Sequence, residues 1–113
     1  MNDFTSTPNF DELAALITER FETLRPLNKQ WAELGRKAIQ GLPYDTYRLA
    51  ELEVRINTLR PELRKLLFVA SEHFTGEQIS QLQKQSGISK YGWRVLKDKR
   101  PVNLKYGFRL VIN

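Results

Sequence analysis

Apolar residues recur at steps of three and four through much of the first two-thirds of the chain, and this spacing is the strongest constraint on the fold. One stripe comprises Phe10, Leu13, Leu16, Ile17, Phe21 and Leu24. A second comprises Leu49, Leu52, Ile56, Leu59, Leu63 and Leu66. A period near 3.6 places such residues on one face of a helix, so the sequence predicts an all-α fold.

Polar residues, prolines and a glycine set the expected ends of the first two helices. Asn9 is a good cap for a helix that begins at Phe10, and Pro26 is expected to end that helix, because the residue before a proline avoids helical geometry. A second helix is expected over residues 28–40, with Gly41 as its stop.

The leucine-rich stripe predicts a third helix that begins near Pro43 or Asp45. Its alternating steps of three and four are typical of a coiled coil or a tightly packed bundle. Pro61 interrupts it, and a proline inside a helix costs roughly 3 kcal/mol but is tolerated in a first turn. We therefore expect one helix to end near Leu59 and another to start near Pro61; a single kinked helix is the alternative.

A short motif, Thr-Leu-Arg-Pro, occurs at residues 23–26 and again at residues 58–61. Flanking positions at the same offset match in apolar character. Two stacked helical hairpins of one type would explain the repetition. Chance similarity between amphipathic helices is the alternative.

Charge is divided unequally along the chain, which has a formal net charge of +5. Residues 1–65 hold ten basic and ten acidic side chains, whereas residues 66–113 hold eight basic and three acidic ones. From Gln78 onward, Asp98 is the single acidic side chain. We therefore expect the carboxyl-terminal part alone to meet a polyanion. A charge that merely keeps a small protein soluble is the alternative.

The composition excludes several classes of site. The chain has no cysteine and one histidine, His73, so disulfides, thiolate metal sites and multi-histidine zinc sites are excluded. No Ser-His-Asp arrangement, phosphate loop or metal-ligand spacing is visible, and we expect neither enzymatic activity nor a cofactor. No apolar run is long enough to span a bilayer, and Asp3 without a basic cluster argues against a secretory signal. We expect a cytoplasmic protein without membrane contact.

Residues 75–96 have the pattern of two short helices joined by a tight turn. Thr75 and Gln78 form the S/T-x-x-E/Q capping box, which predicts the start of a helix. Gly87 supplies the left-handed backbone that a tight turn needs, and Ser89 caps the next helix. A short helix, a glycine turn and a capped helix are typical of a helix-turn-helix.

This stretch resembles the DNA-binding helix-turn-helix of phage-repressor and Cro-type (XRE-like) regulators. The family's apolar positions and its turn glycine are matched by Leu82, Ile88, Trp93, Leu96 and Gly87. Residues 97–104 look like the family's short basic connector, and residues 61–74 would be its first helix. The chain departs from the family at Gln83, Ser86 and Gly92. The resemblance implies a repressor-like, sequence-specific regulator that binds double-stranded DNA through a domain at residues 61–113.

Four side chains are expected to point outward from the second helix of this motif and to reach bases: Lys90, Tyr91, Arg94 and Lys97. Arg94 is the best candidate for a bidentate contact to guanine. Phosphate contacts are expected from Thr75, Gln78, Lys84, Ser89, Lys99, Arg100 and Lys105. A basic helix face is often only solvated, but the turn motif and the division of charge favour contact with DNA.

We expect a homodimer, because one small helix-turn-helix buries little surface and two partners can read two half-sites. Residues 1–60 would form the dimerisation region. Its candidate surfaces are the apolar face of residues 10–24 and the leucine seam of residues 49–66, although either can instead fill the core of the monomer.

Two alternatives stay open. Residues 102–112 fit either a short strand or a helix capped by Asn103, and the helix is favoured. The alternative function is a small helical adaptor or inhibitor, of the phage or plasmid type, that binds a protein partner or an RNA. Tyr91, Tyr106 and Phe108 would then serve as stacking or anchoring groups.

Overall fold

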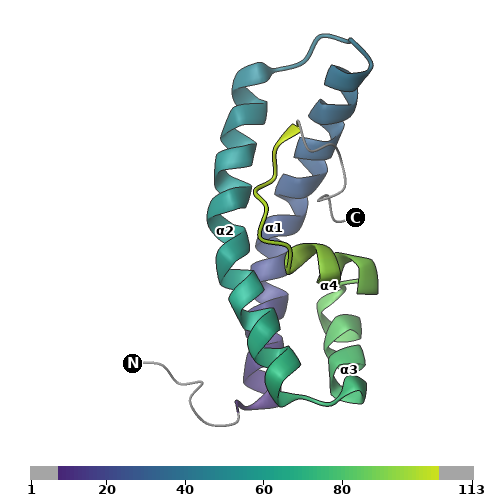
Figure 1. Cartoon of the computed structure of the whole chain (residues 1–113). Helices are drawn as coiled ribbons and strands as arrows, with labels where there is room; N and C mark the ends of the chain where they lie inside the picture. The colour runs from purple at the N-terminus through teal and green to yellow at the C-terminus, as the bar shows by residue number, and fades with distance from the viewer. Residues whose placement is uncertain (1–7, 105–113) are drawn as a thin grey trace.

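The computed structural model describes residues 8–104, and the secondary structure in that range is helical, with no strand. The four helices are α1 (Phe10–Ile39), α2 (Thr46–His73), α3 (Gly76–Ser86) and α4 (Lys90–Leu96). α1 and α2 form a long antiparallel hairpin, and α3 and α4 lie beside the half of it that contains the start of α1 (Figure 1). The all-α prediction is confirmed. Within residues 8–104, none of the helices has the length and apolar character needed to cross a membrane.

The residues expected to cap the long helices do so. The Asn9 side chain accepts a hydrogen bond of 3.0 Å from the backbone N–H of Glu12 at the start of α1. The Asp45 side chain accepts one of 2.9 Å from the N–H of Arg48 at the start of α2. After α1, Gly41 has a φ of 74°, and the N–H groups that follow the helix bond back to its last turn in a Schellman motif.

The helix break expected at Pro26 is wrong, and at Pro61 the structure has a single helix, as in the alternative, in place of the expected break. α1 runs through Pro26 and α2 runs through Pro61, so each pair of expected helices is one helix. Both prolines are exposed. The cost of a helical proline, roughly 3 kcal/mol, is offset because apolar residues on both sides of it bury against the partner helix. Burial of each large apolar side chain is worth roughly 1.5–3 kcal/mol.

The repeated Thr-Leu-Arg-Pro motif lies in the two arms of one hairpin, not in two stacked hairpins. Residues 23–26 are in α1 and residues 58–61 are in α2. The two copies have different environments, because Arg25 is exposed whereas Arg60 is only 2% exposed. The domain boundary expected after residue 60 falls inside α2.

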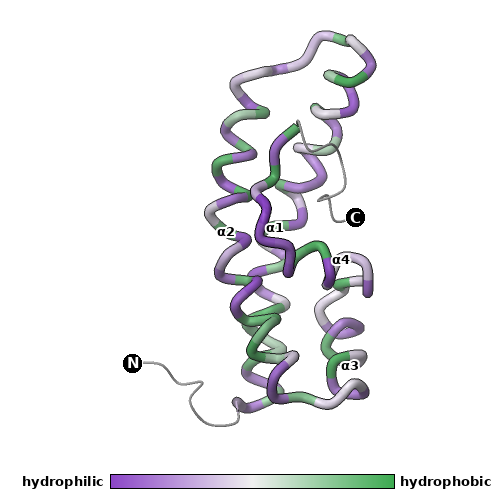
Figure 2. Tube along the Cα trace, viewed as in Figure 1, coloured by the Kyte–Doolittle hydropathy of each residue, from purple (hydrophilic) through white to green (hydrophobic). Residues whose placement is uncertain are grey.

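The hydrophobic core lies between α1 and α2 and extends to α3 and α4. Both predicted stripes contribute to it, with Leu13, Ile17, Phe21 and Leu24 buried on α1 and Leu49, Leu52, Ile56 and Leu63 buried on α2. Figure 2 shows hydrophobic positions interspersed with hydrophilic ones along the two long helices. Trp31 is also buried, and its indole N–H donates a hydrogen bond of 2.9 Å to Glu53. The two surfaces that we considered for a dimer therefore fill the core of the monomer.

α3 packs on α1, and α4 packs on α2. The apolar positions expected for the helix-turn-helix are all buried: Leu82, Ile88, Trp93 and Leu96. Gly87 ends α3 with a φ of 77°, in the left-handed region, as the turn pattern predicts.

After α4 the chain runs back along the hairpin (Figure 1). Asn57 of α2 holds this segment, because its side chain donates to the carbonyl of Val102 at 2.9 Å and accepts from the N–H of Val102 at 2.6 Å. Glu53 accepts from the N–H of Leu104 at 2.9 Å. Residues 101–103 are neither helix nor strand. The expected helix or strand over residues 102–112 otherwise lies outside the described residues.

Candidate nucleic-acid interface

Three of the four residues expected to reach bases lie on the exposed side of α4. Lys90, Tyr91 and Arg94 are exposed. The opposite side of the helix is buried through Gly92, Trp93, Val95 and Leu96. α4 therefore has one side that packs on the protein and one that presents two cations and a phenol to solvent.

Lys97, the fourth of these residues, lies against α2 instead. Its Nζ is 4.7 Å from the centre of the Phe68 ring and 3.3 Å from the hydroxyl oxygen of Ser71. The side chain is half-buried. We expected Lys97 to point away from the core with the other three, but as the cap residue of α4 it turns toward the neighbouring helix.

Three residues expected to contact phosphate are engaged in helix caps. The Thr75 hydroxyl accepts from the Gln78 N–H at 3.2 Å, and the Gln78 side-chain oxygen accepts from the Thr75 N–H at 3.0 Å. The predicted capping box is confirmed. The Ser89 hydroxyl accepts from the Gly92 N–H at 2.9 Å. A phosphate contact by these groups would compete with the caps that hold α3 and α4.

An open hollow of about 590 Å³ lies between α3 and the start of α4. It is lined by Ser80, Gln83, Lys84, Gly87, Ile88, Ser89 and Lys90. Lys84 and Lys90 supply two positive charges to it, and no carboxylate is among its lining residues. A hollow with this lining favours an anionic group.

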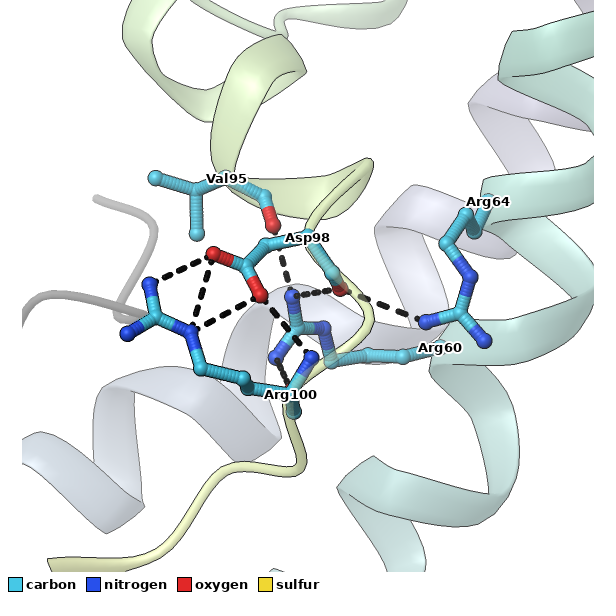
Figure 3. Close-up of polar contacts among 5 residues, drawn as sticks. All are labelled: Arg60, Arg64, Val95, Asp98 and Arg100. Atoms are coloured by element: carbon cyan, nitrogen blue, oxygen red, sulfur yellow. Dashed lines mark hydrogen bonds and ion pairs between the residues drawn. The ribbon is translucent and has the colours of Figure 1, made fainter. Parts of the chain in front are cut away.

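The basic residues after α4 have different partners. Lys99 is exposed. The guanidinium of Arg100 binds the carboxylate of Asp98, with Nη2 at 2.6 Å from Oδ2 and Nε at 3.1 Å from Oδ1 (Figure 3). These hydrogen bonds lower the pKa of Asp98 to about 2. The carboxylate of Asp98 therefore offsets much of the positive charge that Arg100 would present to a bound anion. Lys105 lies outside the described residues.

Arg60 and Arg64 of α2 were not among the expected site residues, yet both contact the segment that follows α4. Arg60 donates to the carbonyl oxygens of Val95 at 2.7 Å, Asp98 at 3.3 Å and Arg100 at 3.4 Å (Figure 3). Arg64 donates to the same Asp98 carbonyl at 3.3 Å. Burial and the neighbouring Arg64 lower the pKa of Arg60, and Asp98 opposes that shift.

The sequence carried one signal for Arg60. It follows Ile56 by four residues and precedes Leu63 by three, which is the spacing of the buried leucine seam. A charged residue at a core-facing position needs partners, because a buried charge without hydrogen bonds is strongly unfavourable.

Comparison with known proteins gives no relative from which a function could be transferred. No protein-family model, curated protein or solved structure matches this chain. The function proposed below therefore depends on the residues and the geometry of the chain itself.

Proposed function

We propose that this protein is a repressor-like transcriptional regulator that binds double-stranded DNA sequence-specifically through α3 and α4. The observation that carries the proposal is the exposed side of α4, where Lys90, Tyr91 and Arg94 stand on a helix whose other side is buried. The left-handed Gly87 and the Ser89 cap that precede this helix support a helix-turn-helix. The resemblance to phage-repressor and Cro-type regulators supports the same function.

The roles of the side chains follow from the chemistry of the grooves. An α-helix fits the major groove, and an arginine that binds guanine through two hydrogen bonds contributes about 1–3 kcal/mol of discrimination. Arg94 has that role. Lys84 and Lys99 make sequence-independent phosphate contacts that orient the module. The surrounding region supports this use, because Glu77 and Asp98 are the only acidic side chains from Gly76 to Leu104.

The proposed homodimer requires a surface other than the two that fill the core. Exposed apolar side chains at the tip of the hairpin provide one, since Ile39 is 62%, Leu42 50% and Tyr47 89% exposed. They lie at the end of α1 and the start of α2, away from α3 and α4 (Figure 1). A dimer through the tip leaves both copies of α4 accessible.

The proposal is tested by comparing the affinity of the protein for two DNA duplexes of equal length. One duplex is selected from a random library for binding, and the other has a random sequence. Fluorescence anisotropy should show that Arg94→Ala weakens binding to the selected duplex by about tenfold or more, with a much smaller effect on the random duplex. Lys84→Ala should weaken both alike and reduce the salt dependence. Arg55→Ala removes an exposed charge elsewhere on α2 and is the matched control. Equal losses on both duplexes for Arg94→Ala would contradict the reading role.

The second candidate function is an adaptor that binds another protein, and the exposed apolar tip favours it. Beside that tip lies a hollow of about 570 Å³ lined by Leu34 and Leu42 together with charged and amide side chains. Absence of duplex binding, together with a protein partner whose capture is lost in Leu42→Ser, would favour this function. Preference for single-stranded DNA or RNA over duplex would favour the RNA-binding form of the alternative.

A further inference from the structure

A small basic pocket lies on the side of α2 that faces the segment after α4. It has a volume of about 70 Å³ and is lined by Asn57, Arg60, Pro61, Arg64, Lys99, Arg100 and Pro101. Four of these residues are cations, and none is a carboxylate. Asp98, an acidic residue next to the lining residue Lys99, does not line the pocket and is already bound by Arg100. The pocket therefore carries an excess of positive charge at short range.

Arg60 has a buried hydrogen-bond donor without an acceptor. Its side chain is 2% exposed, and the Nε atom has no partner among the described residues, although both Nη atoms donate to carbonyls. Buried donors in folded proteins are almost always satisfied. The Nε atom exposes less than 1 Å² of surface, so it makes no direct contact in the pocket, but it leaves part of the Arg60 charge without a hydrogen-bond acceptor. The guanidinium of Arg64 adds to the imbalance, because a second positive charge beside the buried Arg60 disfavours the charged form of Arg60.

We propose that this pocket binds a phosphate group. Guanidinium groups match the oxygens of phosphate through pairs of parallel hydrogen bonds, and two or more cations suit a dianion. A pocket of this size holds a few waters or one compact tetrahedral anion, and it excludes a nucleoside or a peptide. The remainder of a phosphorylated ligand lies outside, where Lys99 and Arg100 are exposed.

Two sources of phosphate share this chemistry, the backbone of a nucleic acid and a small phosphorylated molecule. In either case the anion bridges α2 and the segment after α4, because Arg60 and Arg64 come from the helix and Lys99 and Arg100 from the segment. Binding therefore links the middle of the hairpin to the end of α4. The pocket is separate from the exposed side of α4 and shares only Lys99 with the proposed DNA interface, and its phosphate binding can be measured without DNA.

Calorimetric titration of the full chain with inorganic phosphate, at constant ionic strength set with chloride, tests the proposal. The double variant Arg64→Gln/Lys99→Gln should bind phosphate at least about tenfold more weakly, because each cation contributes a charge-assisted hydrogen bond. Arg55→Gln/Lys65→Gln removes the same charge from exposed positions of α2 outside the pocket and should bind as the wild type does. Neither variant touches Arg60, so the hydrogen bonds from Arg60 to Val95, Asp98 and Arg100 are kept; Arg64→Gln removes the 3.3 Å bond from Arg64 to the Asp98 carbonyl.

Two results would overturn the proposal: no phosphate binding by the wild type, or equal loss of binding in the two double variants. A competition arm separates the sources. If inorganic phosphate weakens binding to a random duplex more than chloride does at equal ionic strength, the pocket takes a backbone phosphate. If duplex binding is unchanged while phosphate still binds, the pocket takes a small phosphorylated ligand. Because phosphate binding is measured without DNA, its failure is distinguishable from a failure of the proposed function.

Discussion

Arg60 holds the chain that follows α4, and its replacement by methionine tests how far the fold depends on one buried cation. The variant Arg60→Met removes donors from three carbonyls, at 2.7 Å for Val95, 3.3 Å for Asp98 and 3.4 Å for Arg100. The shortest of these is a buried, charge-assisted bond worth about 1.5–3 kcal/mol, and the longer two are weak. Removal of the charge also removes the cost of burying it, which offsets part of the loss. We expect the free energy of unfolding to fall by about 2 kcal/mol.

The internal repeat provides a matched control. Arg25 occupies the same place in the first Thr-Leu-Arg-Pro motif but is exposed, and its guanidinium lies 5.7 Å from the centre of the Phe21 ring. Arg25→Met should therefore lose no more than about 0.5–1 kcal/mol. Urea denaturation followed by the fluorescence of the buried Trp31 and Trp93 measures both variants. If Arg60→Met proves as stable as Arg25→Met, the hydrogen bonds from Arg60 to the last turn of α4 and to the segment after it are not needed for stability.

Three further predictions concern the turn, the ion pair and the carboxyl-terminal segment. Gly87→Ala should lower the free energy of unfolding by about 1–2 kcal/mol, because the φ of Gly87 is 77°. Gly76→Ala is the control and should not lower it, because Gly76 has no positive φ and no atom lies within 4 Å of the added Cβ. Equal melting temperatures for the two variants would contradict this prediction. Because the pKa of Asp98 is lowered to about 2 from 3.8, its stabilising contribution is present above pH 3.8 and is lost as the pH falls through 2. Urea titrations should thus show the stability gap between wild type and Asp98→Asn narrowing from pH 5 to pH 2, and a constant gap would refute the assignment. Asn57→Ala should speed hydrogen exchange of the Val102 amide, with α3 amides as the control; unchanged exchange would show that the segment is held by other contacts.

The features predicted correctly from sequence are those determined by neighbours in the chain. Asn9 and Ser89 cap helices because a short polar side chain can reach an N–H two or three residues ahead. The box of Thr75 and Gln78 and the left-handed Gly87 are equally local. The turn between α3 and α4 could therefore be located from a few residues, whatever the rest of the chain does.

The features predicted wrongly depend on contacts between distant parts of the chain. Pro61 would end an isolated helix, but α2 passes through it because the leucines on both sides bury against α1. The spacing of the apolar stripes shows that these side chains must be buried against another surface. The spacing does not show whether that surface is another helix of the monomer or a second copy of the chain. Lys97 has a sequence position typical of an exposed residue, and its contact with Phe68 depends on how α4 docks.

α4 has seven residues, and isolated helices shorter than about 12–15 residues are marginal in water, so its orientation must come from its neighbours. Trp93 and Leu96 fix one side of it in the core. Arg60 donates to the Val95 carbonyl in its last turn, where a cation also favours the negative end of the helix dipole. α2 therefore sets the direction in which the exposed side of α4 faces. A helix held in this way loses little conformational entropy when it docks, so we expect substitutions at Arg60 to alter duplex binding through the position of α4, in addition to any loss of phosphate binding in the basic pocket.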